Sequence, residues 1–140
     1  MLEFSYSETL EASAQKTWHV MRDFAAIARA GLAERVEMVG EGIGSCRHLQ
    51  MPGGLVLVER LEARDDAART LTYAMTEPGP MPLTHYQATL QVSGDEQACQ
   101  VLFSATYEPR AISEEKATRM LSNVYRALIN TARADLGLAG

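Results

Sequence analysis

Apolar and polar residues alternate along most of this chain, and a period of two is typical of half-buried β-strands. Residues 2–10 begin the series, with Leu2, Phe4 and Tyr6 on one face and polar residues between them. Glycine-rich or proline-rich stretches separate the later segments, as expected for turns and loops. The predicted strands lie within residues 2–10, 34–51 (two strands joined by a turn at Gly40 to Gly44), 55–66, 69–76, 84–92 and 99–109.

Helical spacing appears in two short segments after the first strand. Residues 14–24 carry Trp18 at a core position, and Ser13 before them is a favourable N-cap. Residues 25–31 predict a second short helix that Gly31 ends. The chain therefore leaves its first strand for two short helices before the remaining strands begin.

The end of the sequence predicts one long helix. Ser113 is its expected N-cap, acidic residues follow at the positive end of the helix dipole, and Gly137 ends it. Strands followed by a long amphipathic helix indicate an α+β fold, in which a curved antiparallel sheet of about seven strands wraps around the helix. Such a sheet leaves an internal cavity against the helix. We expect residues 1–140 to form a single domain.

Composition narrows the possible functions. The net charge is −5 with no run of basic residues, which argues against nucleic acid or an anionic membrane surface as a partner. No apolar run reaches the ~20 residues of a membrane span, and the N-terminus lacks the features of a signal peptide, so a cytoplasmic location is expected. Cys46 and Cys99 are expected to be free thiols. Neither a metal-binding cluster nor a cofactor motif is present in the sequence.

One carboxylate lies where a strand should be apolar. Glu59 shares its predicted face with Leu57 and Leu61, and antiparallel pairing about a turn at Gly53 places Arg47 opposite Glu59. A buried carboxylate is costly without a partner. Two interpretations stay open: the pair is structural and fixes strand register, or it lines a cavity and acts on a ligand as a binding or catalytic group.

The same strand parity selects the other candidate cavity residues. Buried phenols need partners for their hydroxyl groups, so tyrosines are better candidates than leucines. By contrast, Glu62, Asp65 and Asp66 are expected only to solvate the turn after the strand. The predicted ligand-binding residues are Leu57, Glu59, Tyr73, Tyr86, Ala88, Phe103, Leu121, Tyr125 and Ile129.

Several motifs resemble one known superfamily. A Gly-x-Gly before a strand with an arginine (Gly42, Gly44, Arg47) is followed by a Gly-Gly turn and by "ERLEARDDAARTLTY", "MPLTHY", "SATYEP" and "RADLG". Together they resemble the SRPBCC superfamily of START/Bet v 1-like helix-grip proteins, and within it the polyketide cyclase/dehydrase-like subgroup. The chain is also similar to plant abscisic-acid receptors, which implies gate loops at Gly53, Gly54, Met81 and Pro82.

Three functions are consistent with the sequence. The first is binding of a small hydrophobic or aromatic molecule in the cavity. The second is a cyclase/dehydratase-type enzyme in which Glu59 acts as acid or base beside Arg47. The third is a protein-interaction or chaperone-like module. We expect no cofactor and no metal, and a monomer or a homodimer.

Overall fold

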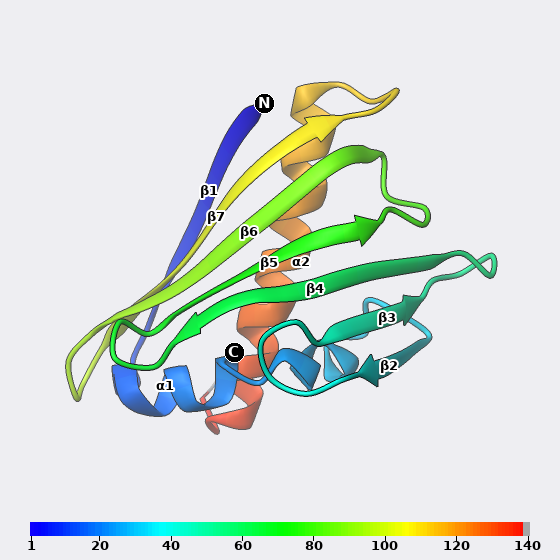
Figure 1. Ribbon diagram of the computed structural model, residues 1–140. Coiled ribbons are helices and arrows are strands. Elements are labelled where there is room, and N and C mark those ends of the chain that lie inside the picture. The colour runs from blue at the N-terminus through cyan, green and yellow to red at the C-terminus, as the bar shows by residue number, and fades with distance from the viewer. Residues whose placement is uncertain (139–140) are drawn as a thin grey trace.

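A computed structural model describes residues 1–138 of this 140-residue protein as a strongly curved sheet that holds one long helix (Figure 1). The sequence prediction of a helix-grip fold is confirmed. The elements are β1 (Leu2–Leu10), α1 (Ala14–Met21), the 3₁₀ helix η1 (Phe24–Arg29), β2 (Arg35–Val39), β3 (Cys46–Gln50), β4 (Val56–Asp65), β5 (Thr70–Glu77), β6 (Leu83–Gly94), β7 (Cys99–Pro109) and α2 (Glu114–Asp135).

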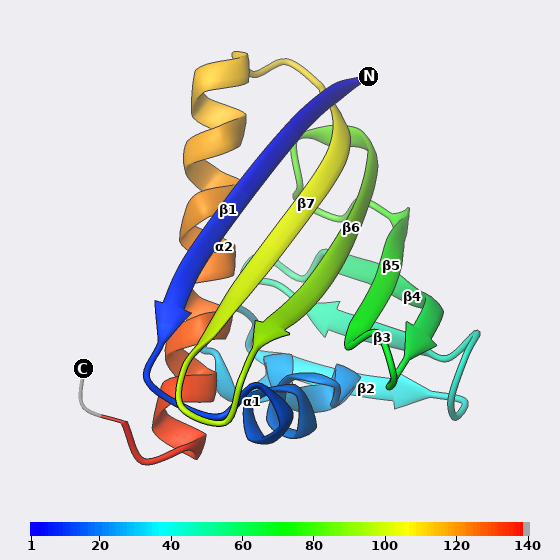
Figure 2. The ribbon, with the colours of Figure 1, turned by 90° about the vertical axis from the view of Figure 1, so that its left-hand side faces the viewer.

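The seven strands form one antiparallel sheet in the order β1-β7-β6-β5-β4-β3-β2. The second view shows the sheet curling around α2, with α1 and η1 below its lower end (Figure 2). From α2, Leu121, Tyr125 and Ile129 are fully buried against the concave face. None of the described helices is long and apolar enough to cross a membrane.

Local sequence explains where the helices begin. The hydroxyl of Ser13 accepts a hydrogen bond from Lys16 N at 3.0 Å, and that of Ser113 accepts one from Lys116 N at 3.2 Å. These caps satisfy backbone donors that a helix leaves free in its first turn. Both predicted N-caps are therefore confirmed.

The short helices differ from the prediction in their bounds. The first ends at Met21 instead of continuing to Phe24, and the second is a 3₁₀ helix that begins at Phe24. Asp23 is the reason, because its carboxylate accepts a hydrogen bond from Ala25 N at 3.0 Å and caps a new helix. The chain therefore bends here, so that η1 contacts β2 and Ile27 packs with Leu49 of β3.

The register of β3 and β4 matches the prediction. Arg47 pairs with Glu59 and Leu49 pairs with Leu57. Met51 N donates a hydrogen bond to the carbonyl oxygen of Leu55 at 2.9 Å and closes the turn between the strands. Both turn glycines have positive φ, so the turn needs residues without a side chain.

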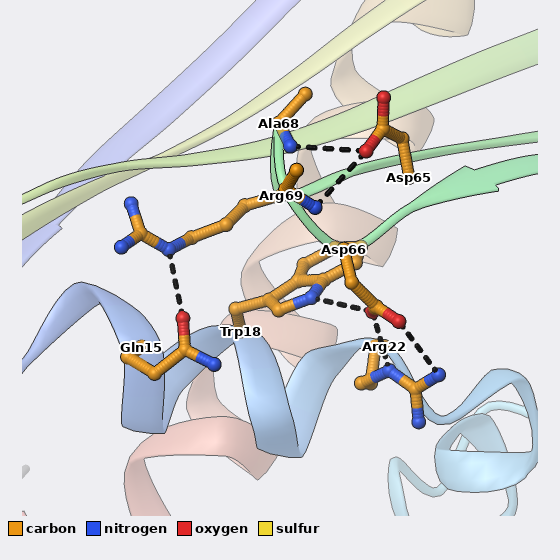
Figure 3. Close-up of polar contacts among 8 residues, drawn as sticks. Gln15, Trp18, Arg22, Asp65, Asp66, Ala68 and Arg69 are labelled. Atoms are coloured by element: carbon orange, nitrogen blue, oxygen red, sulfur yellow. Dashed lines mark hydrogen bonds and ion pairs between the residues drawn. The ribbon is translucent and has the colours of Figure 1, made fainter.

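The prediction that the acidic residues only solvate the β4–β5 turn was wrong for Asp65 and Asp66. Asp65 Oδ1 accepts hydrogen bonds from Ala67 N at 3.0 Å and Ala68 N at 3.1 Å within the turn. Asp66 does more than solvate the β4–β5 turn, because it fastens this turn to α1 (Figure 3). Its Oδ1 accepts hydrogen bonds from Trp18 Nε1 at 2.9 Å and Arg22 Nε at 2.8 Å. Trp18 is buried and its N–H requires a partner, which Asp66 supplies from 48 residues away. Both cysteines are free thiols, as expected.

Candidate ligand-binding site

A pocket of about 270 Å³ lies between the concave face of the sheet and the first half of α2. Strands β3 to β6 supply one wall, α2 the opposite wall, and η1 and the proline-rich loop before β6 the remaining sides. Most of the lining is apolar, as is typical of small-molecule sites. The lining residues are Ile27, Leu32, Arg47, Leu49, Met51, Leu57, Glu59, Tyr73, Pro80, Met81, Pro82, Tyr86, Met120, Leu121 and Val124.

A buried ion pair supplies the charged groups of this pocket. Arg47 and Glu59 are each 4% exposed, and both Nε and Nη2 of Arg47 lie 2.8 Å from Glu59 Oε1. Arg47 Nη1 also donates a hydrogen bond to the carbonyl oxygen of Phe24 at 3.0 Å. The guanidinium carbon lies 4.1 Å from the centre of the Phe24 ring and 4.6 Å from that of Tyr73. Arg47 is therefore fixed from several sides.

Glu59 is held less completely than its partner. Oε1 receives both contacts from Arg47, whereas Oε2 accepts no hydrogen bond from the residues that the structure describes. Oε2 is not among the buried side-chain atoms that lack a partner in the described residues, so it keeps some exposed surface, and Glu59 lines the pocket. One carboxylate oxygen thus remains available on the pocket wall.

Three phenols form a chain that leads from the pocket into the core. The hydroxyls of Tyr73 and Tyr86 are 3.3 Å apart, and those of Tyr86 and Tyr125 are 2.6 Å apart. Burial raises the pKa of Tyr73 to about 12 and raises the pKa values of Tyr86 and Tyr125 further above their usual value. All three are neutral hydroxyl groups at neutral pH.

Five of the predicted ligand-binding residues lie on the pocket wall: Leu57, Glu59, Tyr73, Tyr86 and Leu121. Tyr125 does not line the pocket, but its hydroxyl is hydrogen-bonded to that of Tyr86, which does. Phe103 lines a second, smaller cavity of about 40 Å³, which Arg47 and Tyr73 also line.

Ala88 and Ile129 do not line the pocket and are 0% exposed in the core. The stacked rings of Phe103 and Tyr125, with centres 4.4 Å apart, fill the concave face in this region. Parity placed Ala88 correctly on the concave face but could not indicate that this end is filled.

Two of the four predicted gate residues line the pocket and two do not. Met81 and Pro82 line the pocket, whereas Gly53 and Gly54 lie in the β3–β4 turn outside its lining. Leu55, beside these glycines, is 52% exposed.

Other lining residues were not selected from the sequence. Some carried a usable signal, because Leu49 and Met51 share the parity of Arg47, and Met120 and Val124 belong to the apolar stripe of α2. Ile27, Leu32 and Pro80 lie in a 3₁₀ helix or in loops, which have no sequence period. Such segments cannot be placed against a wall by periodicity.

A seven-stranded antiparallel sheet that grips a C-terminal helix defines a Bet v 1-like helix-grip protein. The sequence matches, over residues 1–137, the family model described as polyketide cyclase / dehydrase and lipid transport, and the chain belongs to this family. Among curated proteins no match is found.

Solved structures with the same fold come from bacteria and plants. The XoxI protein of Bacillus cereus has a TM-score of 0.82 at 24% identity, covering 96% of this chain and 95% of its own. Norcoclaurine synthase from Thalictrum flavum has a TM-score of 0.76 at 20% identity, with 99% and 87% covered. The Zhui aromatase/cyclase from Streptomyces sp. R1128 has a TM-score of 0.69 at 20% identity, with 94% of each chain covered. At these identities the likeness establishes the fold alone.

Proposed function

We propose that this protein binds a small, largely apolar or aromatic molecule in the pocket between the sheet and α2. The pocket itself carries this proposal: about 270 Å³ with apolar walls and four polar side chains, Arg47, Glu59, Tyr73 and Tyr86. A few convergent polar groups in an apolar space orient a ligand whose binding is driven by burial of apolar surface. The family description, which names lipid transport beside cyclase and dehydrase activity, agrees with an apolar ligand.

The Arg47–Glu59 pair supports a ligand-binding function over a purely structural one. Burying two charges costs several kcal/mol of desolvation per ion, and apolar residues of similar size often give equal or better stability. A pair that serves register alone has no need of a pocket beside it. Here the pair lies at the pocket wall with one oxygen of Glu59 unengaged by the described residues.

Ligand binding is tested by filling the pocket. Val124 lines it from α2 and is only half-buried, so Val124→Trp should occupy the space without rebuilding the core. Naphthalene derivatives should raise the melting temperature of the wild type, and this rise should disappear in Val124→Trp. The matched control is Val39→Trp, because Val39 is 49% exposed on the edge strand β2, away from the pocket. Equal stabilisation of wild type and Val124→Trp would place the binding elsewhere and end the proposal.

A second candidate is a cyclase/dehydratase-type reaction with Glu59 as acid or base. The available Oε2 of Glu59 favours it, since a general base needs a free oxygen facing the substrate. The aromatase/cyclase and norcoclaurine synthase among the structural neighbours show that this fold can hold enzymes. Glu59→Gln should lower the turnover of a poly-β-ketone by about 10²- to 10⁴-fold. Unchanged turnover would remove Glu59 from the reaction and leave ligand binding untouched.

A further inference from the structure

The phenol chain contains one hydrogen-bond donor more than it can use. Each of the three hydroxyls has one proton to donate, and two hydrogen bonds join them. The hydroxyl of Tyr125 is fully buried, and Tyr86 is its single partner among residues 1–138. Its proton must therefore go to Tyr86, because a buried donor without an acceptor is costly.

That assignment leaves Tyr73 and Tyr86 with two protons and one hydrogen bond between them. Whichever of the two donates in that bond, the other keeps a free O–H. Both residues line the pocket, so the free donor lies at the pocket wall. The chain thus presents one phenolic O–H that has no acceptor within the described part of the protein.

The ion pair has the opposite feature, a hydrogen-bond acceptor without a donor. Glu59 Oε2 is an ionised acceptor without a donor from the described residues, on the same pocket wall as Tyr73 and Tyr86. Arg47, which contacts Glu59 at 2.8 Å, also has its guanidinium carbon 4.6 Å from the centre of the Tyr73 ring, so the ion pair adjoins the phenol chain. The wall therefore offers one donor and one acceptor together.

We propose that the pocket selects apolar molecules that carry a hydroxyl group, which accepts from the free phenol and donates to Glu59 Oε2. This inference rests on the proposed ligand-binding function. A hydroxyl is both donor and acceptor, and so it satisfies both groups at once. A ketone or an ether accepts only and leaves Oε2 without a partner. A carboxylate brings a negative charge against Glu59, whose own charge already matches that of Arg47.

Three probes of one shape separate these contributions: 2-naphthol, 2-methoxynaphthalene and naphthalene, with dissociation constants measured by calorimetry at pH 7. Hydrogen bonds to charged groups contribute enough that 2-naphthol should bind about tenfold to a hundredfold more tightly than its methyl ether. The ether should bind more tightly than naphthalene by a smaller factor, because it accepts from the phenol. 2-Naphthoate, a carboxylate of similar size, should bind more weakly than 2-naphthol.

Variants assign the discrimination to Glu59. Glu59→Gln should reduce the preference for 2-naphthol over the ether to below about threefold, because the charged acceptor is gone. Glu62→Gln is the matched control, since Glu62 lies on the same strand but pairs with Arg60 on the outer side, and it should keep the wild-type preference. If Glu59→Gln does not fold, the wild-type ratio of 2-naphthol to ether still decides the question.

The outcomes distinguish this inference from the function beneath it. If none of the aromatic probes binds, the proposed ligand-binding function fails as well. If all three neutral probes bind with similar affinity, the pocket is a binding site but its polar groups do not select a hydroxyl, and this inference alone is overturned. Tightest binding of 2-naphthoate would also overturn it, because Arg47 would then have exchanged Glu59 for the ligand.

Discussion

Two arginine–carboxylate pairs of this protein differ in how many of their carboxylate oxygens accept hydrogen bonds. Arg22 and Asp66 meet at the surface, with side chains 34% and 62% exposed, and both oxygens of Asp66 accept hydrogen bonds. Arg47 and Glu59 meet in the interior, each side chain 5% exposed, and one oxygen of Glu59 stays open. Both carboxylate oxygens accept hydrogen bonds in the surface pair, whereas only one does so in the buried pair.

This difference separates a structural contact from a candidate working group. At the surface, water screens the charges, and Asp66 acts as a hydrogen-bond acceptor for both Arg22 and Trp18. In the interior the desolvation cost is large, and an incomplete set of hydrogen bonds makes it larger. Of the two pairs, the one that is both buried and incompletely hydrogen-bonded is therefore the candidate for ligand binding.

The largest expected effect comes from removing Glu59. Glu59→Ala should lower the free energy of unfolding by about 3–5 kcal/mol, because Arg47 would remain buried without its counter-ion. Urea denaturation measures this loss. A loss below about 1 kcal/mol would mean that water reaches Arg47 and that the pair is not truly buried.

A double replacement sharpens the same comparison. Arg47→Met combined with Glu59→Leu should recover most of the stability, since apolar residues of similar volume remove the desolvation cost. The recovered protein should nevertheless have lost its preference for 2-naphthol over the methyl ether. A double variant as unstable as Glu59→Ala would assign the pair a structural role that packing cannot replace.

The next effect concerns the proline-rich loop that lines the same pocket as the buried pair. Gly79 has φ of 53°, and a Cβ there would lie 2.8 Å from backbone atoms of Val56 and Leu57. Gly79→Ala should therefore displace the proline-rich loop and weaken ligand binding. Gly53→Ala is its control, because φ is also positive there but no atom lies within 4 Å of the added Cβ. Gly53→Ala should cost only the backbone strain, about 1–2 kcal/mol, and leave affinity near that of the wild type.

Phenol ionisation gives a pH-dependent effect of intermediate size. Burial raises the pKa of all five tyrosines, with Tyr73 at about 12. Because the folded pKa values lie above the unfolded value of about 10, the stability from neutral phenols is complete below pH ~10 and is lost as the pH rises toward 12. Phenolate absorbance of the folded protein should therefore appear at a higher pH than in urea, where tyrosine ionises near pH ~10. Early ionisation in the folded state would mean that the phenol chain is exposed to water.

The smallest expected effect belongs to the surface pair. Hydrogen bonds from Arg22 and Trp18 lower the pKa of Asp66, so its contribution to stability is present above the unfolded pKa of about 3.9. That contribution is lost as the pH falls through the lower folded value. Trp18 is the single tryptophan, and its fluorescence should report this titration in the wild type and not in Asp66→Asn. Identical acid profiles for the two proteins would show that Asp66 does not hold the indole.

The difference between the two pairs also marks how far the sequence could predict the structure. Strand parity and a glycine turn were sufficient to pair Arg47 with Glu59, because both residues belong to one hairpin and register follows from local geometry. The contact of Asp66 with Trp18 joins a turn to a helix 48 residues away, and no periodic pattern reports such packing. Hairpin contacts are thus encoded locally, while helix-to-turn contacts depend on how the whole sheet curves.

The pocket follows the same division. Leu57, Tyr73 and Tyr86 were placed on the concave face by alternation, and they do line the pocket. Alternation gives the face of a strand residue but not its position along the curved sheet, so Ala88 was grouped with them although that end is packed. Ile129 was selected from the apolar stripe of the helix, which has the same limit. Ile27 lines the pocket because the chain bends at Asp23. The bend comes from a side-chain cap, and a hydrophobic pattern does not record such a cap.

Methionine methyl NMR tests the central claim most directly. Met51 in the β3–β4 turn, Met81 in the loop before β6 and Met120 in α2 line the pocket, whereas Met1 and Met38 are exposed away from it. Titration with 2-naphthol should shift the methyl signals of Met51, Met81 and Met120 together with a single affinity, and leave those of Met1 and Met38 in place. Shifts confined to Met1 or Met38, or none at saturating 2-naphthol, would contradict ligand binding in this pocket.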